Sequence, residues 1–460
     1  MSGEDLTFWW MDSPMQPTTM AMLIILDRTP DERLLRKAFE RAVVAVPRLT
    51  QRVATAPFTI TLPHWEPDPT FDLDYHLRRH ALPRAHDLEE LFREIAPVYE
   101  APFDRSRPLW EARIYEGLAD GQAALFFKLH HAVADGVGAN AIFAAMTDAC
   151  RDDAACVDVP PLPATAAGWA SERGIVTRVA EAVRDRIELD VSRVGSVATT
   201  MVDAVLHPTQ LGRALEIVRS ITGTLAFDSG SPLRGATGRK RRMTGIALPF
   251  AQMRRVKHAL GGTMIDVILA TMALAMGRWH AEHGLGEVAE LMTLVPVNLR
   301  PAEQWGDGGG LGNRATGILV PLPIRIGHVR ETYEVIRSRM AAKKADPASH
   351  ATPAIAEILS ALPRGLVSWM TEATFSVVDF IVTNVPGVLV PRYMAGAEIL
   401  AAYPFAPVAR HSPLSVALYG YRDALFVGLD ADEATMPDLD RFTSILSDTF
   451  AELCGVAGVV

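Results

Sequence analysis

The chain has 460 residues, 49% of them hydrophobic and 22% charged, which is enough apolar material for two soluble globular domains with substantial cores. With 54 acidic against 45 basic residues, its formal net charge of -9 argues against a general polyanion-binding surface, so we expect no nucleic-acid partner. Three cysteines, Cys150, Cys156 and Cys454, form neither a paired framework nor a metal-spaced cluster, which fits a reducing cytoplasm.

Targeting segments are not evident in the sequence. The N-terminal residues place no basic side chain ahead of an apolar core, so no secretory signal is predicted. Apolar runs such as 267–276 and 380–390 are interrupted well before the roughly 18 residues that a membrane span needs. Any membrane contact is therefore expected to be peripheral.

The first 156 residues alternate between strand and helix patterns. Residues 20–26 predict a buried strand, and residues 31–46 predict an amphipathic helix that Asp31 caps. A second helix is expected over residues 88–99. A strand follows at 123–129, because this run is rich in Phe and almost entirely apolar. This part of the chain is interpreted as a first α/β domain.

A second α/β pattern follows a long connector. Residues 157–242 begin with a Pro-rich crossover and continue as a helical region with mixed apolar and charged residues, which predicts covering helices. Residues 243–460 then repeat the α/β character of the first part. Strands are expected over residues 244–248, 291–297, 315–322, 380–383, 414–419 and 424–429, and helices over residues 250–260, 265–277, 329–342 and 436–454.

Two adjacent histidines stand where the strand at 123–129 breaks into a turn. His130 and His131 are followed by the turn formers Asp135 and Gly136, and helical periodicity resumes over residues 140–150. Successive side chains of a strand point to opposite faces, so the two histidines cannot both face one cleft. One of them is expected to be structural, and the other is a candidate proton acceptor.

The stretch HHAVADG at residues 130–136 fits the HHxxxDG signature of CoA-dependent acyltransferases. Its surroundings resemble the bacterial wax ester synthase/acyl-CoA:diacylglycerol acyltransferase family in particular. The matching segments are PFDRSRPLWE at 102–111, EGL at 116–118, PVNLR at 296–300, LGN at 311–313, NVPG at 384–387 and YMAGA at 393–397. The chain departs from the family pattern at three places: Ile265-Asp266 replaces Asn-Asp, SPLR at 231–234 replaces TPLN, and Val388 replaces the last proline of NVPGP.

The resemblance implies an α/β fold of two chloramphenicol-acetyltransferase-like domains, each a mixed β-sheet flanked by helices. A helical connector would join the two, and an active-site tunnel would run between them. On this interpretation residues 1–156 form the N-terminal domain with the HHxxxDG motif, residues 157–242 the connector, and residues 243–460 the C-terminal domain.

The resemblance also implies a role for each residue of the signature. His131 is the expected general base, and His130 then faces the core and holds the strand. Asp135 is expected to turn inward to a cation, with Arg300 as the candidate partner, and Gly136 completes the motif. The oxyanion donor is expected to be either Asn298 or backbone amides of the turn at 135–138.

Other features have competing interpretations. Pro108, Leu109 and Trp110 are expected to pack and to shape the acyl region, and Asp266 and Asn384 are further candidates from the matching segments. The run at 239–242 (RKRR) either meets CoA phosphates or is solvated. For the histidines, the alternatives are a satisfied core histidine or a metal site with Asp135. A metal site needs a third ligand, and none has suggestive spacing, so no metal is predicted.

The implied reaction moves a long-chain acyl group from acyl-CoA to diacylglycerol or a fatty alcohol, giving triacylglycerol or a wax ester without any cofactor. The expected partners are these substrates and the surface of the inner membrane or a lipid droplet on the cytoplasmic side, with a homodimer left open. Two rivals remain: a same-fold enzyme that acylates a polyketide alcohol or an amine, and a non-catalytic lipid-binding or droplet-coating protein.

Overall fold

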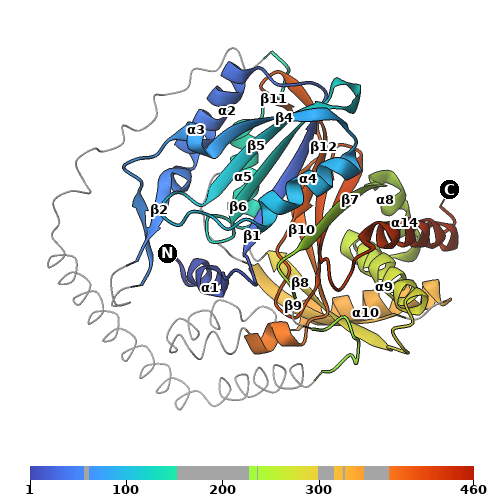
Figure 1. Cartoon of the computed structure of the whole chain (residues 1–460). Helices are drawn as coiled ribbons and strands as arrows, with labels where there is room; N and C mark the ends of the chain where they lie inside the picture. The colour runs from blue at the N-terminus through green and yellow to red at the C-terminus, as the bar shows by residue number, and fades with distance from the viewer. Residues whose placement is uncertain are drawn as a thin grey trace.

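The computed structural model describes residues 1–55, 62–152, 227–235, 237–298, 315–324, 327–346 and 372–459. Within these ranges the chain folds around two six-stranded sheets and a separate pair of short strands (Figure 1). Most of the predicted connector, together with Cys156 and Arg300, lies outside the described residues.

The first sheet has the order β11-β12-β1-β6-β5-β4, and only the β4/β5 pair is parallel. Helices α2 (Glu32–Ala45) and α5 (Gly136–Met146) cover one face, where Phe39 contacts Phe127. Helix α4 (Leu88–Glu100) covers the other face, where Lys128 donates to Val98 O at 2.7 Å. The strands are β1 (Thr19–Leu26), β4 (Leu77–His86), β5 (Trp110–Leu118), β6 (Ala123–His130), β11 (Tyr393–Met394) and β12 (Ala397–Phe405).

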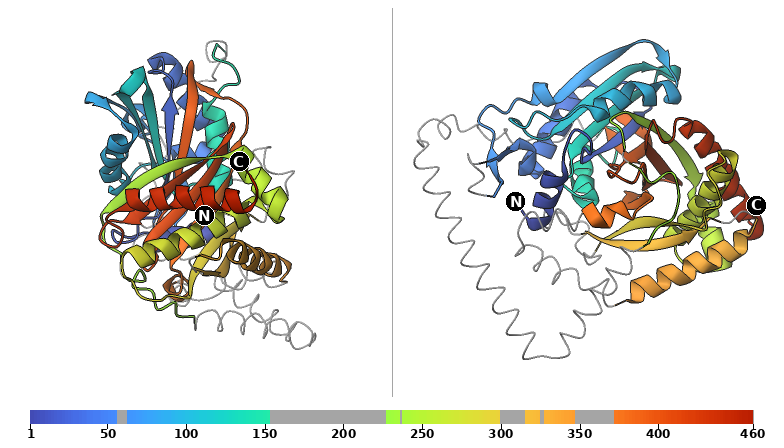
Figure 2. Two further views of the ribbon diagram at one scale, coloured as in Figure 1. Left: turned by 90° about the vertical axis from the view of Figure 1, so that its right-hand side faces the viewer. Right: turned by 60° about the horizontal axis from the view of Figure 1, so that its bottom comes forward.

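The second sheet has the order β7-β14-β13-β10-β8-β9 and mixes parallel with antiparallel pairs. Its strands are β7 (Arg241–Pro249), β8 (Glu290–Asn298), β9 (Ala315–Pro323), β10 (Phe380–Val388), β13 (Leu414–Tyr421) and β14 (Ala424–Asp432). Its helices lie together away from the first sheet (Figure 2): α8 (Phe250–Leu260), α9 (Met264–Glu282), α10 (Val329–Ala345) and α14 (Leu439–Val456).

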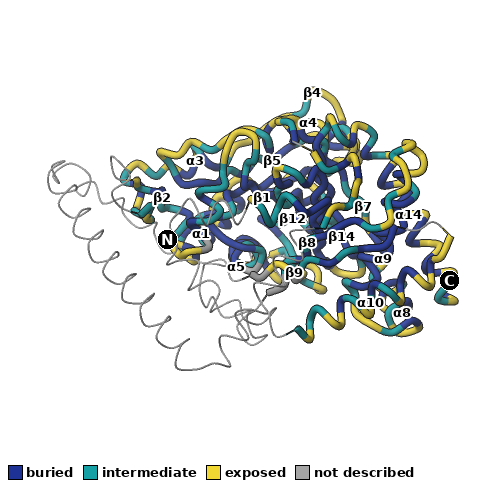
Figure 3. The backbone as a smooth tube through the Cα atoms, turned by 90° about the horizontal axis from the view of Figure 1, so that it is seen from below, coloured by how far each residue is buried: buried dark blue, intermediate teal, exposed yellow. Residues whose placement is uncertain are grey.

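Short elements complete the described chain. They are α1 (Gly3–Met11), η1 (Pro47–Thr50), β2 (Gln51–Ala54), β3 (His64–Pro67), α3 (Leu73–His76) and η3 (Ala119–Gly121). The backbone is largely buried where the two sheets meet and exposed along the outer loops (Figure 3).

The predicted strands and helices of the described ranges are present, with small shifts at their ends. Asp31 caps α2 as expected, since its carboxylate accepts a hydrogen bond from Leu34 N at 3.0 Å. Helix α5 begins at Gly136 and not at residue 140, because Asp135 caps it. The sequence patterns missed α1, β4, β5 and β12, and also the short elements β2, β3, β11 and α3.

The missed strand β12 changes the division into domains. It comes from the predicted C-terminal domain, yet it pairs antiparallel with β1, from Ala21↔Phe405 to Leu26↔Ile399. Residues 393–405 therefore belong to the first sheet, and the boundary predicted at residue 243 does not separate the sheets. The chain returns to the second sheet through β13.

The two sheets approach each other closely at a pair of glycines. Gly428 on β14 and Gly245 on β7 are cross-strand partners, and β12 passes directly over them. A Cβ atom on Gly428 would lie 1.7 Å from Pro404 O, and one on Gly245 would lie 2.5 Å from Tyr403 Cδ1. Only residues without a side chain fit this contact.

Replacing Gly428 by alanine is expected to force the two sheets apart, because the Pro404 carbonyl is rigid backbone. We expect the free energy of unfolding to fall by at least about 2 kcal/mol, measured by urea denaturation. Gly455→Ala is the matched control: nothing lies within 4 Å of its added Cβ on α14, so its stability should stay within about 1 kcal/mol of the wild type. Equal stability of the two variants would contradict this packing.

A cluster of buried charges lies beneath α4, where the two sheets join. Arg241 pairs with Asp432 at 3.4 Å, and each side chain is only 1% exposed. Asp430 lies fully buried beside Arg241 and Tyr99. Burial raises the pKa of the Asp430 carboxyl to about 7, although the positive charge of Arg241 opposes the shift.

The raised pKa of Asp430 predicts a pH-dependent stability. Between about pH 4 and pH 7 the folded chain keeps a proton on this carboxyl that the unfolded chain has lost, so the free energy of unfolding should fall as the pH rises through this window. Asp430→Asn is neutral throughout and should flatten the fall between about pH 4 and pH 7 in urea denaturation. Asp440→Asn, at a partly exposed pair with Arg242, should keep the wild-type profile. An unchanged slope in Asp430→Asn would contradict the assignment.

Candidate active site

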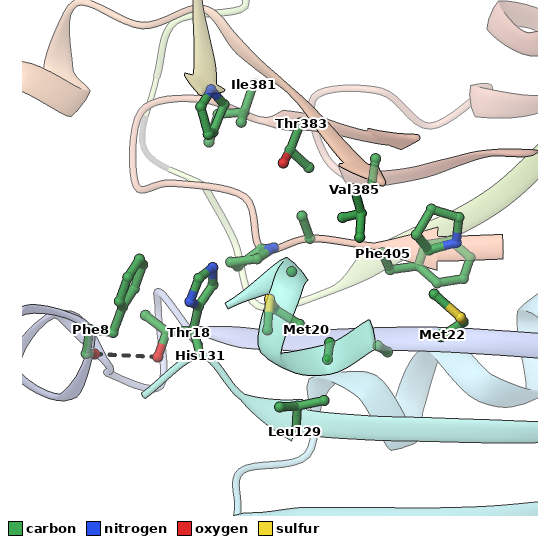
Figure 4. Close-up of a pocket in the computed structure, with 18 of the residues that line it drawn as sticks. Phe8, Thr18, Met20, Met22, Leu129, His131, Ile381, Thr383, Val385 and Phe405 are labelled. Atoms are coloured by element: carbon green, nitrogen blue, oxygen red, sulfur yellow. Dashed lines mark hydrogen bonds between the residues drawn. The ribbon is translucent and has the colours of Figure 1, made fainter. Parts of the chain in front are cut away.

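A deep apolar cavity lies between the α5 face of the first sheet and strands β8 and β10 of the second (Figure 4). It encloses about 1220 Å³, counting its open mouth. Its lining includes Phe8, Met11, Gln16, Thr18, Met20, Met22, Ile24, Phe127, Leu129, His131, Gly136, Ala139, Phe143, Met146, Leu294, Pro296, Phe375, Ile381, Thr383, Val385, Phe405 and Ala417.

His130 is buried and hydrogen-bonded through both ring nitrogens. Ala132 N donates to Nδ1 at 3.0 Å, so the proton of the neutral ring is on Nε2. Nε2 lies 3.1 Å from Thr18 Oγ1, which in turn donates to Phe8 O at 3.3 Å. These contacts tie the end of β6 to α1 and to the start of β1, and they leave His130 facing away from the apolar cavity.

His131 is the first residue after β6, and its side chain lines the cavity. Its backbone N–H donates to Thr18 O at 2.8 Å, which continues the β1/β6 pairing by one residue. The ring stacks on Phe8 with centroids 3.8 Å apart and planes 11° apart. The two histidines thus point to opposite faces of the first sheet, as strand alternation predicted.

Asp135 and Gly136 shape the turn beside His131. The Asp135 carboxylate accepts from Gly138 N at 2.8 Å and caps α5. A Cβ atom on Gly136 would lie 3.0 Å from Val385 Cγ2, so the absence of a side chain lets β10 approach the turn closely. The family resemblance implied a cation as the partner of Asp135, and the structure shows in addition that Asp135 caps α5.

The structure describes the positions of only some of the predicted oxyanion donors. Asn298 ends β8, and its side chain is outside the described residues, as is all of Arg300. Among the amides of the turn, Gly138 N is already engaged by Asp135. The Arg300 partnership with Asp135 stays a prediction.

Pro108, Leu109 and Trp110 are buried, as expected of packing residues. Trp110 Nε1 donates to Leu49 O at 2.8 Å, and its ring contacts Phe127, which lines the cavity. None of the three lines the cavity directly, so this segment shapes the cavity only through its neighbours.

Asp266 and Asn384 lie apart from His131. Asp266 completes the N-terminal cap of α9, since Oδ2 accepts from Thr263 N at 2.6 Å. Asn384 lines a smaller cavity together with Ile265, and Val385 borders both this cavity and the large one. Isoleucine in place of the family asparagine therefore adds an apolar wall near the site.

At residues 231–234, where SPLR replaces the TPLN of the family pattern, two of the side chains make specific contacts. Arg234 pairs with the buried Asp379 at 3.1 Å, and Ser231 Oγ lies 2.9 Å from His280 Nε2. These contacts anchor the C-terminal part of the predicted connector against the second sheet. The third departure, Val388, continues β10 and pairs with Tyr421.

A second cavity of about 1580 Å³, counting its opening, lies on the His130 side. Its lining is more polar and includes Asp12, Glu100, Arg105, His130 and Arg239. Of the basic run at 239–242, only Arg239 lines this cavity. The other three form ion pairs: Lys240 with Glu433, Arg241 with Asp432 and Arg242 with Asp440.

The sequence patterns did not reveal the partners of the histidines. Phe8 and Thr18 come from the first 18 residues, and no local signal marks them. The alternation of Met20, Met22 and Ile24 along β1 is the one signal that could have indicated a face lining a cavity.

The described ranges contain neither a cluster of potential metal ligands nor a single membrane-spanning helix. There, no group of three or more His, Cys, Asp or Glu side chains could hold a metal ion. In the same ranges no single helix is long and apolar enough to cross a membrane, and α8 and α9 pass that test only jointly, across a 96° bend.

Comparison with known proteins identifies the family. The family model described as the wax ester synthase/diacylglycerol acyltransferase catalytic domain matches residues 1–268, and the corresponding C-terminal domain matches residues 311–454. A putative diacylglycerol O-acyltransferase of Mycobacterium tuberculosis is 31% identical over 459 residues, covering 97% of this chain and 89% of that protein. A probable diacylglycerol O-acyltransferase of the same species is 26% identical over 442 residues, covering 95% of this chain and 91% of that protein.

Solved structures confirm the predicted fold of two mixed sheets flanked by helices. The wax ester synthase/diacylglycerol acyltransferase of Marinobacter aquaeolei VT8 superposes with a TM-score of 0.66 at 23% identity, covering 99% of this chain and 98% of that one. The first condensation domain of the calcium-dependent antibiotic synthetase gives a TM-score of 0.64 at 17% identity, covering 99% and 95%. The family models and the relatives span nearly the whole chain, and the chain belongs to the wax ester synthase/diacylglycerol acyltransferase family.

Proposed function

We propose that this protein transfers a long-chain acyl group from acyl-CoA to the hydroxyl of a diacylglycerol or a fatty alcohol. The product is a triacylglycerol or a wax ester. The observation that carries the proposal is the position of His131, whose ring stands at one end of a long apolar cavity in a chain of this family.

His131 acts as the general base in this proposal. The neutral imidazole takes the proton of the acceptor hydroxyl while the hydroxyl oxygen attacks the thioester carbonyl. The tetrahedral intermediate then collapses, the carbon–sulfur bond breaks, and the departing thiolate takes the proton from the imidazolium. No acyl-enzyme forms, and the base ends each cycle neutral.

The surroundings of His131 support this chemistry. Stacking on Phe8 fixes the plane of the ring, and the backbone bond to Thr18 fixes the position of the residue. The apolar walls limit access of water, which would otherwise hydrolyse the thioester. His130 acts as a positioning residue, because its ring bonds hold the strand end from which His131 projects.

The proposed working place is a lipid surface on the cytoplasmic side, where a diacylglycerol or a fatty alcohol resides. Leu389 and Val390 support a peripheral contact, since these large apolar side chains are 48% and 57% exposed. They follow directly on β10, close to the smaller cavity that Leu389 helps to line.

His131→Ala is expected to lower kcat for CoA release by about 10² to 10⁴-fold, the usual contribution of a positioned general base. The measurement is thiol release from palmitoyl-CoA with hexadecanol or a diacylglycerol as acceptor, together with product analysis. Because the ring lies at the cavity surface, the variant should keep the wild-type unfolding profile and should still bind palmitoyl-CoA.

His64→Ala is the control, because His64 is exposed on β3 and does not line the cavity. It should retain full activity. A folded His131→Ala variant with wild-type turnover would overturn the role of His131. If the wild-type protein binds acyl-CoA but releases no CoA with any acceptor, the proposed enzyme activity is wrong and a lipid-binding function is favoured. If it turns over with amines alone, the acceptor is an amine and not an alcohol.

A further inference from the structure

Strand β1 runs along the cavity away from His131. Thr18, Met20, Met22 and Ile24 all line it, and they are alternate residues that share one face of the strand. At 3.3 Å per residue, the distance from Thr18 to Ile24 is about 20 Å. On the neighbouring strand His131, Leu129 and Phe127 follow the same course.

Helix α5 runs along the cavity in the same direction. Gly136, Ala139, Phe143 and Met146 line it, and their spacing of three, four and three residues forms one stripe of the helix. The stripe begins at the turn beside His131 and extends over about 15 Å at 1.5 Å per residue. Strand β1 and helix α5 therefore line the cavity in the same direction, over about 20 Å and about 15 Å respectively.

Side-chain size increases along the α5 stripe, away from His131. The residues of the stripe near His131 are glycine and alanine, and those at the far end are phenylalanine and methionine. In Figure 4, Met22 and Phe405 lie at the end of the view opposite His131 and Phe8. The α5 wall of the cavity thus has small side chains beside His131 and large apolar side chains at its far end.

The shape suits a single apolar chain. A diacylglycerol carries two chains, whereas the acyl group of a thioester and a fatty alcohol each carry one. The thioester is the substrate that both proposed reactions share, and its carbonyl must reach His131. An extended chain advances about 1.25 Å per carbon at single bonds near 1.5 Å, so a depth of 15–20 Å corresponds to roughly 12–16 carbons.

We propose that this cavity measures the acyl chain of the thioester, with Phe143, Met146 and Ile24 as the end stop and Ala139 as the position that keeps the path open. The inference rests on the proposed function and extends it to chain-length specificity. It predicts a preference for saturated acyl groups of roughly 12–16 carbons.

The test measures kcat/KM for CoA thioesters from butyryl-CoA to arachidoyl-CoA with one fixed acceptor. Ala139→Phe fills the path about one helical turn from Gly136, so it should lower kcat/KM for palmitoyl-CoA by roughly tenfold or more and spare butyryl-CoA. Met146→Ala should move the optimum toward longer chains by about two to four carbons. Retained butyryl-CoA activity shows at the same time that Ala139→Phe is folded.

Ala144→Phe is the matched control, because Ala144 is exposed on another face of α5. It should leave the profile unchanged. An active wild type whose profile does not shift in Ala139→Phe or Met146→Ala overturns the chain-measuring role alone. If the two variants change only the preference among alcohols of different length, tested with palmitoyl-CoA, then the cavity binds the acceptor. That result also overturns the chain-measuring role. A wild type inactive with every thioester overturns the proposed function itself.

Discussion

The site depends on how the end of β6 is held. Ala132 N and Thr18 Oγ1 occupy the two ring nitrogens of His130, and Thr18 O receives the backbone N–H of His131. One buried histidine is thereby fixed so that the next residue must project from the opposite face of the sheet. Strand alternation directs the second imidazole to the cavity face, and these bonds hold the end of β6 where that imidazole stacks on Phe8.

The cavity also requires that the two sheets keep a defined separation. Strand β12 belongs to the first sheet but passes over the glycine pair of the second, and β10 approaches the first sheet closely at a further glycine, Gly136. The buried charges of Arg241, Asp430 and Asp432 lie at the same junction. This packing borders the cavity itself, since Pro404 contacts Gly428 and also lines the cavity.

Much of this arrangement could be predicted from the sequence, because strand β6 is a continuous apolar run and its histidines fall in a motif with several matching neighbours. Alternation alone was enough to assign opposite faces to His130 and His131. Strand β12 was not predictable, because AEILAAYPF lacks clean alternation and its partner β1 lies more than 370 residues earlier in the chain. The Phe8 and Thr18 contacts were missed for the same reason, since they arise only when distant segments meet.

The central claim is that one imidazole faces a thioester at the mouth of a chain-shaped cavity. A crystal structure with a thioether analogue of palmitoyl-CoA, which cannot transfer its chain, tests it most directly. The account predicts the alkyl chain lying along Met20 and Met22 under α5, with the sulfur-bearing end beside the His131 ring. A chain bound in the polar cavity on the His130 side, or outside both cavities with His131 remote from the sulfur, would contradict it.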